Sequence, residues 1–164
     1  LLHIIDDPSG TPINKKETVG DFFNALSTAV TLADSNVTLT EALHAGRICI
    51  TPNVSANRTY TLPTPKVGME FRFIGPTGLA AADGHSVIIA SGAGNSIFFK
   101  GQLVHHDTNQ TGQTSAVIFS DQDSNETLTL AIAQAHDITC LGTSTTTWQL
   151  SGFVASDTAP AFAD

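Results

Sequence analysis

Met69-Glu70-Phe71-Arg72-Phe73 alternates large apolar side chains with charged ones, and the same alternation recurs along the chain. A period of two places the apolar residues on one face of a strand and the polar residues on the other. The pattern is equally clear in Thr59–Leu62, Thr127–Ile132 and Thr147–Ser151. Each run therefore predicts a half-buried strand of an antiparallel sheet, and alternation places Tyr60 and Trp148 in the core.

More strand candidates lie between these runs, and turn signals such as Gly75-Pro76-Thr77-Gly78 separate them. The further candidates are Arg47–Thr51, Ser86–Ala90, Asn95–Lys100, Ala116–Ser120 and Asp137–Leu141. No internal repeat of fixed period is visible. Many short strands with regular turns predict a mainly β fold, an antiparallel β-sandwich of jelly-roll type.

The chain divides near Asp34-Ser35-Asn36, where the pattern changes. Residues 36–164 form the predicted β-sandwich body, and 164 residues suffice for one domain with a hydrophobic core. Residues 1–35 form a predicted N-terminal arm, which opens with a strand candidate at Leu1–Ile5 and a turn at Asp7–Gly10.

A short amphipathic helix completes the arm. Its apolar stripe has helical spacing and consists of Val19, Phe22, Phe23, Leu26 and Val30. A helix this short is not stable alone in water, so it must dock on its own body, on a sister subunit or on another protein. The stripe is therefore a candidate anchor or subunit contact.

The charge of the chain argues against a nucleic-acid partner. The net charge is −8, only 13% of residues are charged, and Lys15-Lys16 is the single pair of adjacent cations. A nucleic-acid interface needs clustered Lys and Arg that displace counterions. A membrane partner is not expected either, because no apolar stretch approaches the roughly 20 residues that span a bilayer.

No catalytic, cofactor or metal site is predicted, and the chain is expected not to be an enzyme. His105-His106-Asp107 is the most tempting cluster, but adjacent strand residues face opposite ways, so one metal could not easily bind both histidines. Asp121–Asn125 resembles the start of a calcium loop, yet Glu126 and Ile132 occupy the places where an EF-hand needs Gly and Glu. We interpret it as an acidic turn.

The two cysteines, Cys49 and Cys140, lie inside apparent strands between aliphatic neighbours. Buried free thiols are the favoured interpretation, and a disulfide stays open if the two strands are adjacent.

Two stretches of the sequence carry recognisable motifs. The first is Leu2–Val19, with Asp6-Asp7-Pro8-Ser9-Gly10-Thr11-Pro12 followed by Lys15-Lys16, and it resembles an element found ahead of the body domains of tailed-bacteriophage virion proteins. The second stretch is similar to a domain of small phage proteins and comprises Leu39–Arg47, with His44-Ala45-Gly46-Arg47, then Thr61-Leu62-Pro63, Glu70–Phe73 and Trp148–Gly152.

The resemblance implies a virion structural protein. Within that class, the favoured interpretation is a capsid decoration or cement protein on the outer surface of the head. Its implied partner is the major capsid protein, and its implied assembly is a homotrimer. Within the motif, His44 and Arg47 could bond carbonyls or a neighbouring subunit's carboxylate, although locking of the local turn is favoured.

Two alternatives from other classes remain open. A tail-fibre or spike module that binds a host glycan would need exposed aromatics, for which Tyr60, Trp148 and Phe98-Phe99 are the candidates. A small secreted hydrolase or metal-binding enzyme would need two or three histidines on one sheet face, and the spacing of the histidines gives no support for this.

Overall fold

The computed structural model describes residues 2–6, 13–17, 29–75, 84–109, 114–131 and 135–164. Residues 18–28 lie outside the described residues, and with them the predicted helix and its stripe of Val19, Phe22, Phe23 and Leu26. Val30, the fifth member of that stripe, belongs to a strand.

The described chain is mainly β, as the alternation predicts, with one short helix. Its elements are β1 (Leu2–Asp6), β2 (Ile13–Glu17), β3 (Val30–Thr31), β4 (Val37–Thr38), α2 (Glu41–His44), β5 (Ile48–Ile50), β6 (Arg58–Thr61), β7 (Glu70–Gly75), β8 (Ser86–Ala90), β9 (Phe98–Asp107), β10 (Ser115–Phe119), β11 (Thr127–Ala131), β12 (Ala135–Gly142), β13 (Thr147–Ser156) and β14 (Ala161–Ala163).

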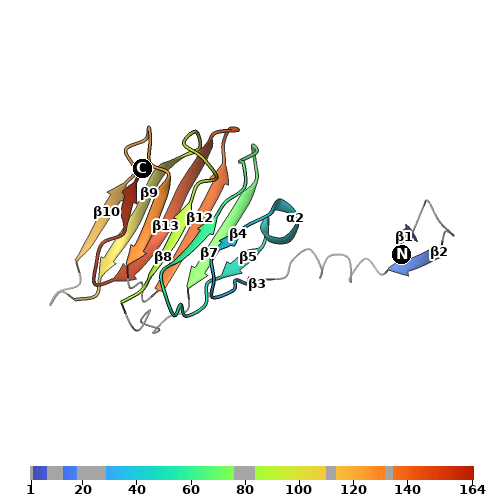
Figure 1. Cartoon of the computed structure of the whole chain (residues 1–164), viewed down its shortest axis with the longest axis horizontal. Coiled ribbons are helices and arrows are strands. Elements are labelled where there is room, and N and C mark those ends of the chain that lie inside the picture. The colour runs from blue at the N-terminus through green and yellow to red at the C-terminus, as the bar shows by residue number, and fades with distance from the viewer. Residues whose placement is uncertain (1, 7–12, 18–28, 76–83, 110–113, 132–134) are drawn as a thin grey trace.

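Two sheets make up the body (Figure 1). The larger has seven strands in the order β10-β9-β13-β12-β7-β5-β3, and the smaller has five in the order β14-β11-β8-β6-β4. The arm contributes β1 and β2, which pair with each other in a separate two-stranded antiparallel sheet. The strand expected near residues 1–5 is thus confirmed as β1.

The expectation of purely antiparallel pairing is wrong. From β3 to β8 the chain alternates between the two sheets, so that β3, β5 and β7 are parallel neighbours in one sheet and β4, β6 and β8 in the other. Strands β9 and β13 are also parallel. The physical reason is that alternation reveals which face of a strand is buried but not which strand lies beside it. The resulting mixed sandwich does not have the all-antiparallel pairing of a jelly roll.

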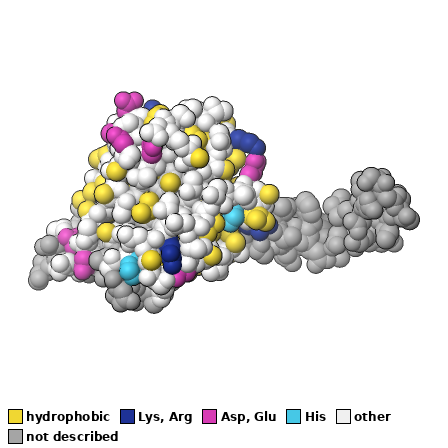
Figure 2. Space-filling view, in the orientation of Figure 1, with side chains coloured by type: hydrophobic (Ala, Val, Ile, Leu, Met, Phe, Trp, Pro, Cys, Tyr) yellow, Lys and Arg dark blue, Asp and Glu magenta, His cyan; other side chains and the backbone are white. Residues whose placement is uncertain are grey.

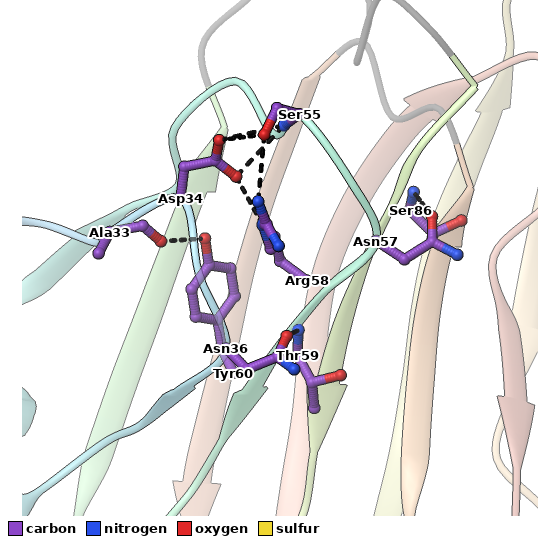
Figure 3. Close-up of polar contacts among 9 residues, drawn as sticks. All are labelled: Ala33, Asp34, Asn36, Ser55, Asn57, Arg58, Thr59, Tyr60 and Ser86. Atoms are coloured by element: carbon purple, nitrogen blue, oxygen red, sulfur yellow. Dashed lines mark hydrogen bonds and ion pairs between the residues drawn. The ribbon is translucent and has the colours of Figure 1, made fainter.

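Asparagine side chains link successive segments of the chain along this alternating path (Figure 3). The Oδ1 of Asn36 accepts a hydrogen bond from the Thr59 amide at 3.0 Å, and the Oδ1 of Asn57 accepts one from the Ser86 amide at 2.9 Å. The two bonds join residues 23 and 29 positions apart. Because these spacings are unequal, no fixed-period repeat is visible in the sequence.

An ion-pair cluster links the segment before β4 to the start of β6 (Figure 3). The Asp34 carboxylate accepts hydrogen bonds from the Arg58 Nε at 2.6 Å and from the Ser55 hydroxyl at 2.7 Å. These donors lower the pKa of Asp34 to about 2. The Tyr60 hydroxyl donates to the Ala33 carbonyl at 3.0 Å, so its ring is buried without an unpaired polar atom.

The core lies between the two sheets, and its largest fully buried side chains are aromatic: Trp148, Tyr60, Phe71, Phe73 and Phe99. Trp148 is fully buried, packs edge-on against Phe71 with ring centroids 5.6 Å apart, and donates its indole N–H to the Ser91 carbonyl at 2.8 Å. Cys49 and Cys140 are buried free thiols, which confirms the interpretation favoured from the sequence.

Candidate interaction surface

An apolar row crosses the outer face of the seven-stranded sheet. Strand register aligns one outward residue from each of six neighbouring strands. We name this set the apolar row; its members are Ile50, Ile74, Asp137, Phe153, Val104 and Val117. Phe153, Val104 and Val117 are 40%, 36% and 47% exposed, so this half of the row faces solvent.

The one charged member of the row is paired. Arg72, from the adjacent rung on β7, donates its Nε and Nη2 to the two Asp137 carboxylate oxygens at 2.8 and 2.6 Å. Hydrogen bonds from this guanidinium hold the pKa of Asp137 below its usual value, so the carboxylate stays ionised. The bidentate pair restrains both side chains and leaves little free charge in the row.

More apolar and aromatic groups flank the row near its β10 end. The His106 ring lies edge-on to Phe153 with centroids 6.3 Å apart, and its Nδ1 lies 2.8 Å from the Ser115 hydroxyl. Phe119, two residues beyond Val117 on β10, is 62% exposed. A cluster of this kind on an exposed sheet face is typical of a protein–protein contact.

The space-filling view agrees with the low charge of the body. Figure 2 shows hydrophobic side chains scattered among uncharged polar ones, with charged side chains mainly towards the rim of the visible face. Such a surface favours contact with another protein over steering of a charged ligand.

A second, smaller apolar area surrounds α2. Leu43 and Val67 are 59% and 79% exposed beside a shallow hollow of about 460 Å³. An ion pair between Lys66 and Glu41 lines the hollow. The hollow is open and has only these charged groups and Glu70 in its lining, so it offers no enclosed reaction site.

His44, a site residue predicted from the sequence, contacts the N-terminal end of its own helix, α2. It is buried, and its Nδ1 lies 3.1 Å from the Thr40 amide nitrogen and 3.3 Å from the Thr40 carbonyl oxygen. This agrees with the favoured interpretation of His44 as a residue that locks a local turn. Arg47 is half-buried just before β5 and does not belong to the apolar row.

The residues considered for chemistry do not converge. His105 points into the core and is 5% exposed, while His106 is on the outer face, as strand geometry requires. The described ranges hold no group of three or more His, Cys, Asp or Glu that could bind a metal ion. Tyr60 and Trp148 are fully buried, so the glycan-stacking role considered for these two rings is wrong.

The acidic stretch after β10 is a turn, as predicted. The Asp121 carboxylate accepts bonds from the amides of Asp123, Ser124 and Asn125 at 2.9, 3.0 and 3.2 Å. These bonds lower the pKa of Asp121 to about 2. The oxygens that resembled calcium ligands therefore serve to close the turn between β10 and β11.

The apolar row is not predictable from the sequence of any one strand. Its residues come from strands far apart in the chain, and only the register brings them into line. One signal is present in the sequence, because Ala116-Val117-Ile118-Phe119 is apolar at consecutive positions. Both faces of this strand are therefore apolar, and one of them must be exposed or covered by a partner.

Comparison with known proteins gives no match, either among family models or among curated proteins and solved structures. Within the described part of the chain, no helix is both long and apolar enough to cross a membrane.

Proposed function

We propose that this chain is a non-enzymatic structural protein of a tailed-bacteriophage particle, and specifically a decoration or cement protein on the outside of the head. The phage-like elements of the sequence supply the class of protein. The observation that carries the binding role is the apolar row, in which Phe153, Val104 and Val117 are exposed side by side and the single charged residue, Asp137, is paired with Arg72.

The mechanism is passive. The outer face of the seven-stranded sheet rests on the major capsid protein and buries the exposed half of the row, Phe153, Val104 and Val117. A few hundred Å² of apolar contact contributes on the order of several kcal/mol at about 25 cal/mol per Å². The entropy of association offsets much of this for one copy, and many copies on one shell recover it through their high effective concentration.

The location of the protein on the phage particle tests whether it is a decoration protein of the head. Immunogold electron microscopy uses an antibody against residues 36–164 and intact particles of the phage that encodes the chain. Label over the head supports decoration. Label confined to the tail would overturn it in favour of a host-binding module, and unlabelled particles would contradict a virion role.

A double substitution tests the face. Phe153→Ser with Val104→Ser removes two exposed apolar side chains of the row, so we expect it to weaken co-sedimentation with purified heads at least tenfold. Val67→Ser is the matched control, because Val67 is even more exposed but lies by α2. Equal binding by both variants, each checked for an unchanged thermal midpoint, would rule out the row as the contact.

A further inference from the structure

Strand β10 is the longest open edge of the body. In the described chain it pairs with β9 only, and the other edge strands, β3, β4 and β14, have two, two and three residues against five in β10. Proteins protect such edges by making them short or by adding Lys, Pro or a bulge, because an open edge templates pairing with another strand. The three short edges are protected in this way and β10 is not.

The backbone of β10 presents a regular set of free groups. Asp107 donates its amide to the Thr114 carbonyl at 3.0 Å, and Ser120 donates its amide to the Gly101 carbonyl at 3.2 Å. In an antiparallel ladder the bonded residues alternate, so even-numbered residues 114–120 bond to β9. The N–H and C=O groups of residues 115, 117 and 119 therefore point away from β9, towards the open edge.

The sequence of the edge strand and its flanks contains no charged residue. Residues 108–120 contain no Asp, Glu, Lys or Arg, although the chain as a whole carries a net charge of −8. All five residues of β10 are also at least partly exposed, with Val117 at 47% and Phe119 at 62%. Two acidic copies can thus meet here without placing like charges opposite each other.

We propose that a second copy of this chain occupies the edge, with the two β10 strands antiparallel about a two-fold axis at Val117. Outward residues must face outward residues, and the two-fold places Val117 opposite Val117 and Ser115 opposite Phe119. This register satisfies every outward N–H and C=O of both strands. It also joins the apolar rows of the two copies end to end through Val117.

The size of the contact sets its strength. A five-residue strand is about 17 Å long and a sheet is about 10 Å thick, so edge pairing covers on the order of 200 Å² of each copy. That is below the roughly 800 Å² per partner of a standard stable interface, so the pair dissociates on dilution. A two-fold pair also differs from the homotrimer that the phage resemblance implies, which makes the two assemblies separable by mass.

Disulfide trapping tests the register. Val117→Cys places two thiols across the axis in a pair whose Cα atoms are about 5.5 Å apart, within the range of a disulfide. Val104→Cys is the matched control: the same residue type in the same row on β9, but separated from its symmetry mate by three strand spacings, about 14 Å, which no disulfide spans. Native Cys49 and Cys140 are buried and do not compete.

Mild oxidation of the full-length protein should trap most of the Val117→Cys chain as a covalent dimer and at most a tenth as much of the Val104→Cys chain. Equal trapping of both variants would overturn the edge register, and so would no trapping of either.

Sedimentation tests the pairing without cysteines. Wild-type protein should shift from monomer towards dimer between about 10 µM and about 1 mM, the range suited to a transient interface. Val117→Pro removes an amide that faces the open edge and leaves the β9 ladder intact, so it should stay monomeric with the wild-type circular dichroism spectrum. A wild type that is monomeric throughout, a trimer, or a proline variant that still dimerises would each refute the proposal. None of these outcomes depends on whether the protein binds phage heads.

Discussion

Acid should destabilise this protein through one buried histidine, His136. Its side chain is 4% exposed, and its Nε2 lies 3.0 Å from the Thr51 hydroxyl oxygen. Because that hydroxyl donates to the Ile74 carbonyl at 3.2 Å, we assign the ring proton to Nε2. The Nδ1 atom is buried and has no hydrogen-bond partner among the residues that the structure describes, so a second proton there would be a buried, unpaired donor on a charged ring.

The backbone of β7 packs closely against the His136 ring. A Cβ at Gly75 would lie 2.2 Å from the His136 Cε1 and 2.4 Å from its Nδ1, so the backbone of β7 already touches the imidazole. Burial lowers the pKa of His136 to about 4 from the ordinary 6.5, and the charge of Asp137 on the opposite face of the strand offsets this only in part.

The sign of the pH effect follows from proton binding. Between about pH 6.5 and pH 4 the unfolded chain binds the proton and the folded chain does not, so the free energy of unfolding falls as the pH is lowered. At about 1.4 kcal/mol per pKa unit, the loss from about pH 7 to about pH 4.5 is about 2–3 kcal/mol. The carboxyl groups of Asp34 and Asp121, whose pKa values are also lowered, lose their stabilising effect mainly below about pH 4 and contribute little in this window.

Urea unfolding followed by tryptophan fluorescence at these two pH values measures the loss directly. His136→Gln keeps an N–H donor for Thr51 but cannot titrate, so its stability should change little over the same interval. His106→Gln, at an exposed site on β9, should retain the wild-type loss. If the wild type is equally stable at both pH values, or if His136→Gln loses as much as the wild type, the assignment of the acid effect to His136 is wrong.

Substitutions at three further positions probe the core, the contact between β9 and β13, and the turn after β10. Trp148→Phe removes the bond to the Ser91 carbonyl and leaves a cavity, so urea unfolding should show a loss of about 2–4 kcal/mol, and an unchanged value would mean the site repacks around water. Gly101→Ala should prevent accumulation of folded protein in a soluble-expression assay, because the new Cβ would lie 2.2 Å from the Leu150 carbonyl oxygen at a φ of +109°; wild-type yield would contradict this geometry. Asp121→Ala should lower the thermal midpoint more than Asp121→Asn, which keeps an acceptor for the turn amides, and equal midpoints would show that these bonds do not stabilise the turn.

Sequence alternation predicted most of the strands but not their neighbours. Each strand longer than three residues in the body overlaps a predicted run, because burial of one face leaves a period of two in the sequence. The two longest strands were predicted only in part: β9 continues to Asp107 and β13 to Ser156, beyond the predicted ends at Lys100 and Ser151. Strands β3, β4 and β14 were missed, since two or three residues are too few to show a period. Parallel pairing was missed because it arises from the path of the chain between two sheets, which no local pattern records.

The candidate surface was harder to predict than the fold for the same reason. Val104, Val117 and Phe153 each look like an ordinary exposed residue in its own strand, and single exposed apolar residues are common. They become a continuous row only through the β9–β10 and β9–β13 registers. The role of His44 was easier to predict, because the His44 ring contacts Thr40, only four residues away in the same local segment.

Strand β13 has a consequence for how the chain is made. It is among the last strands in sequence, yet it lies inside the seven-stranded sheet, between β9 and β12. During synthesis, β9 and β10 can form a hairpin but cannot join the rest of the sheet until Thr147–Ser156 has left the ribosome. A chain that stops short of this strand would be left with two unjoined sheet fragments and new open edges, so incomplete copies should aggregate or be degraded before they can assemble with complete ones.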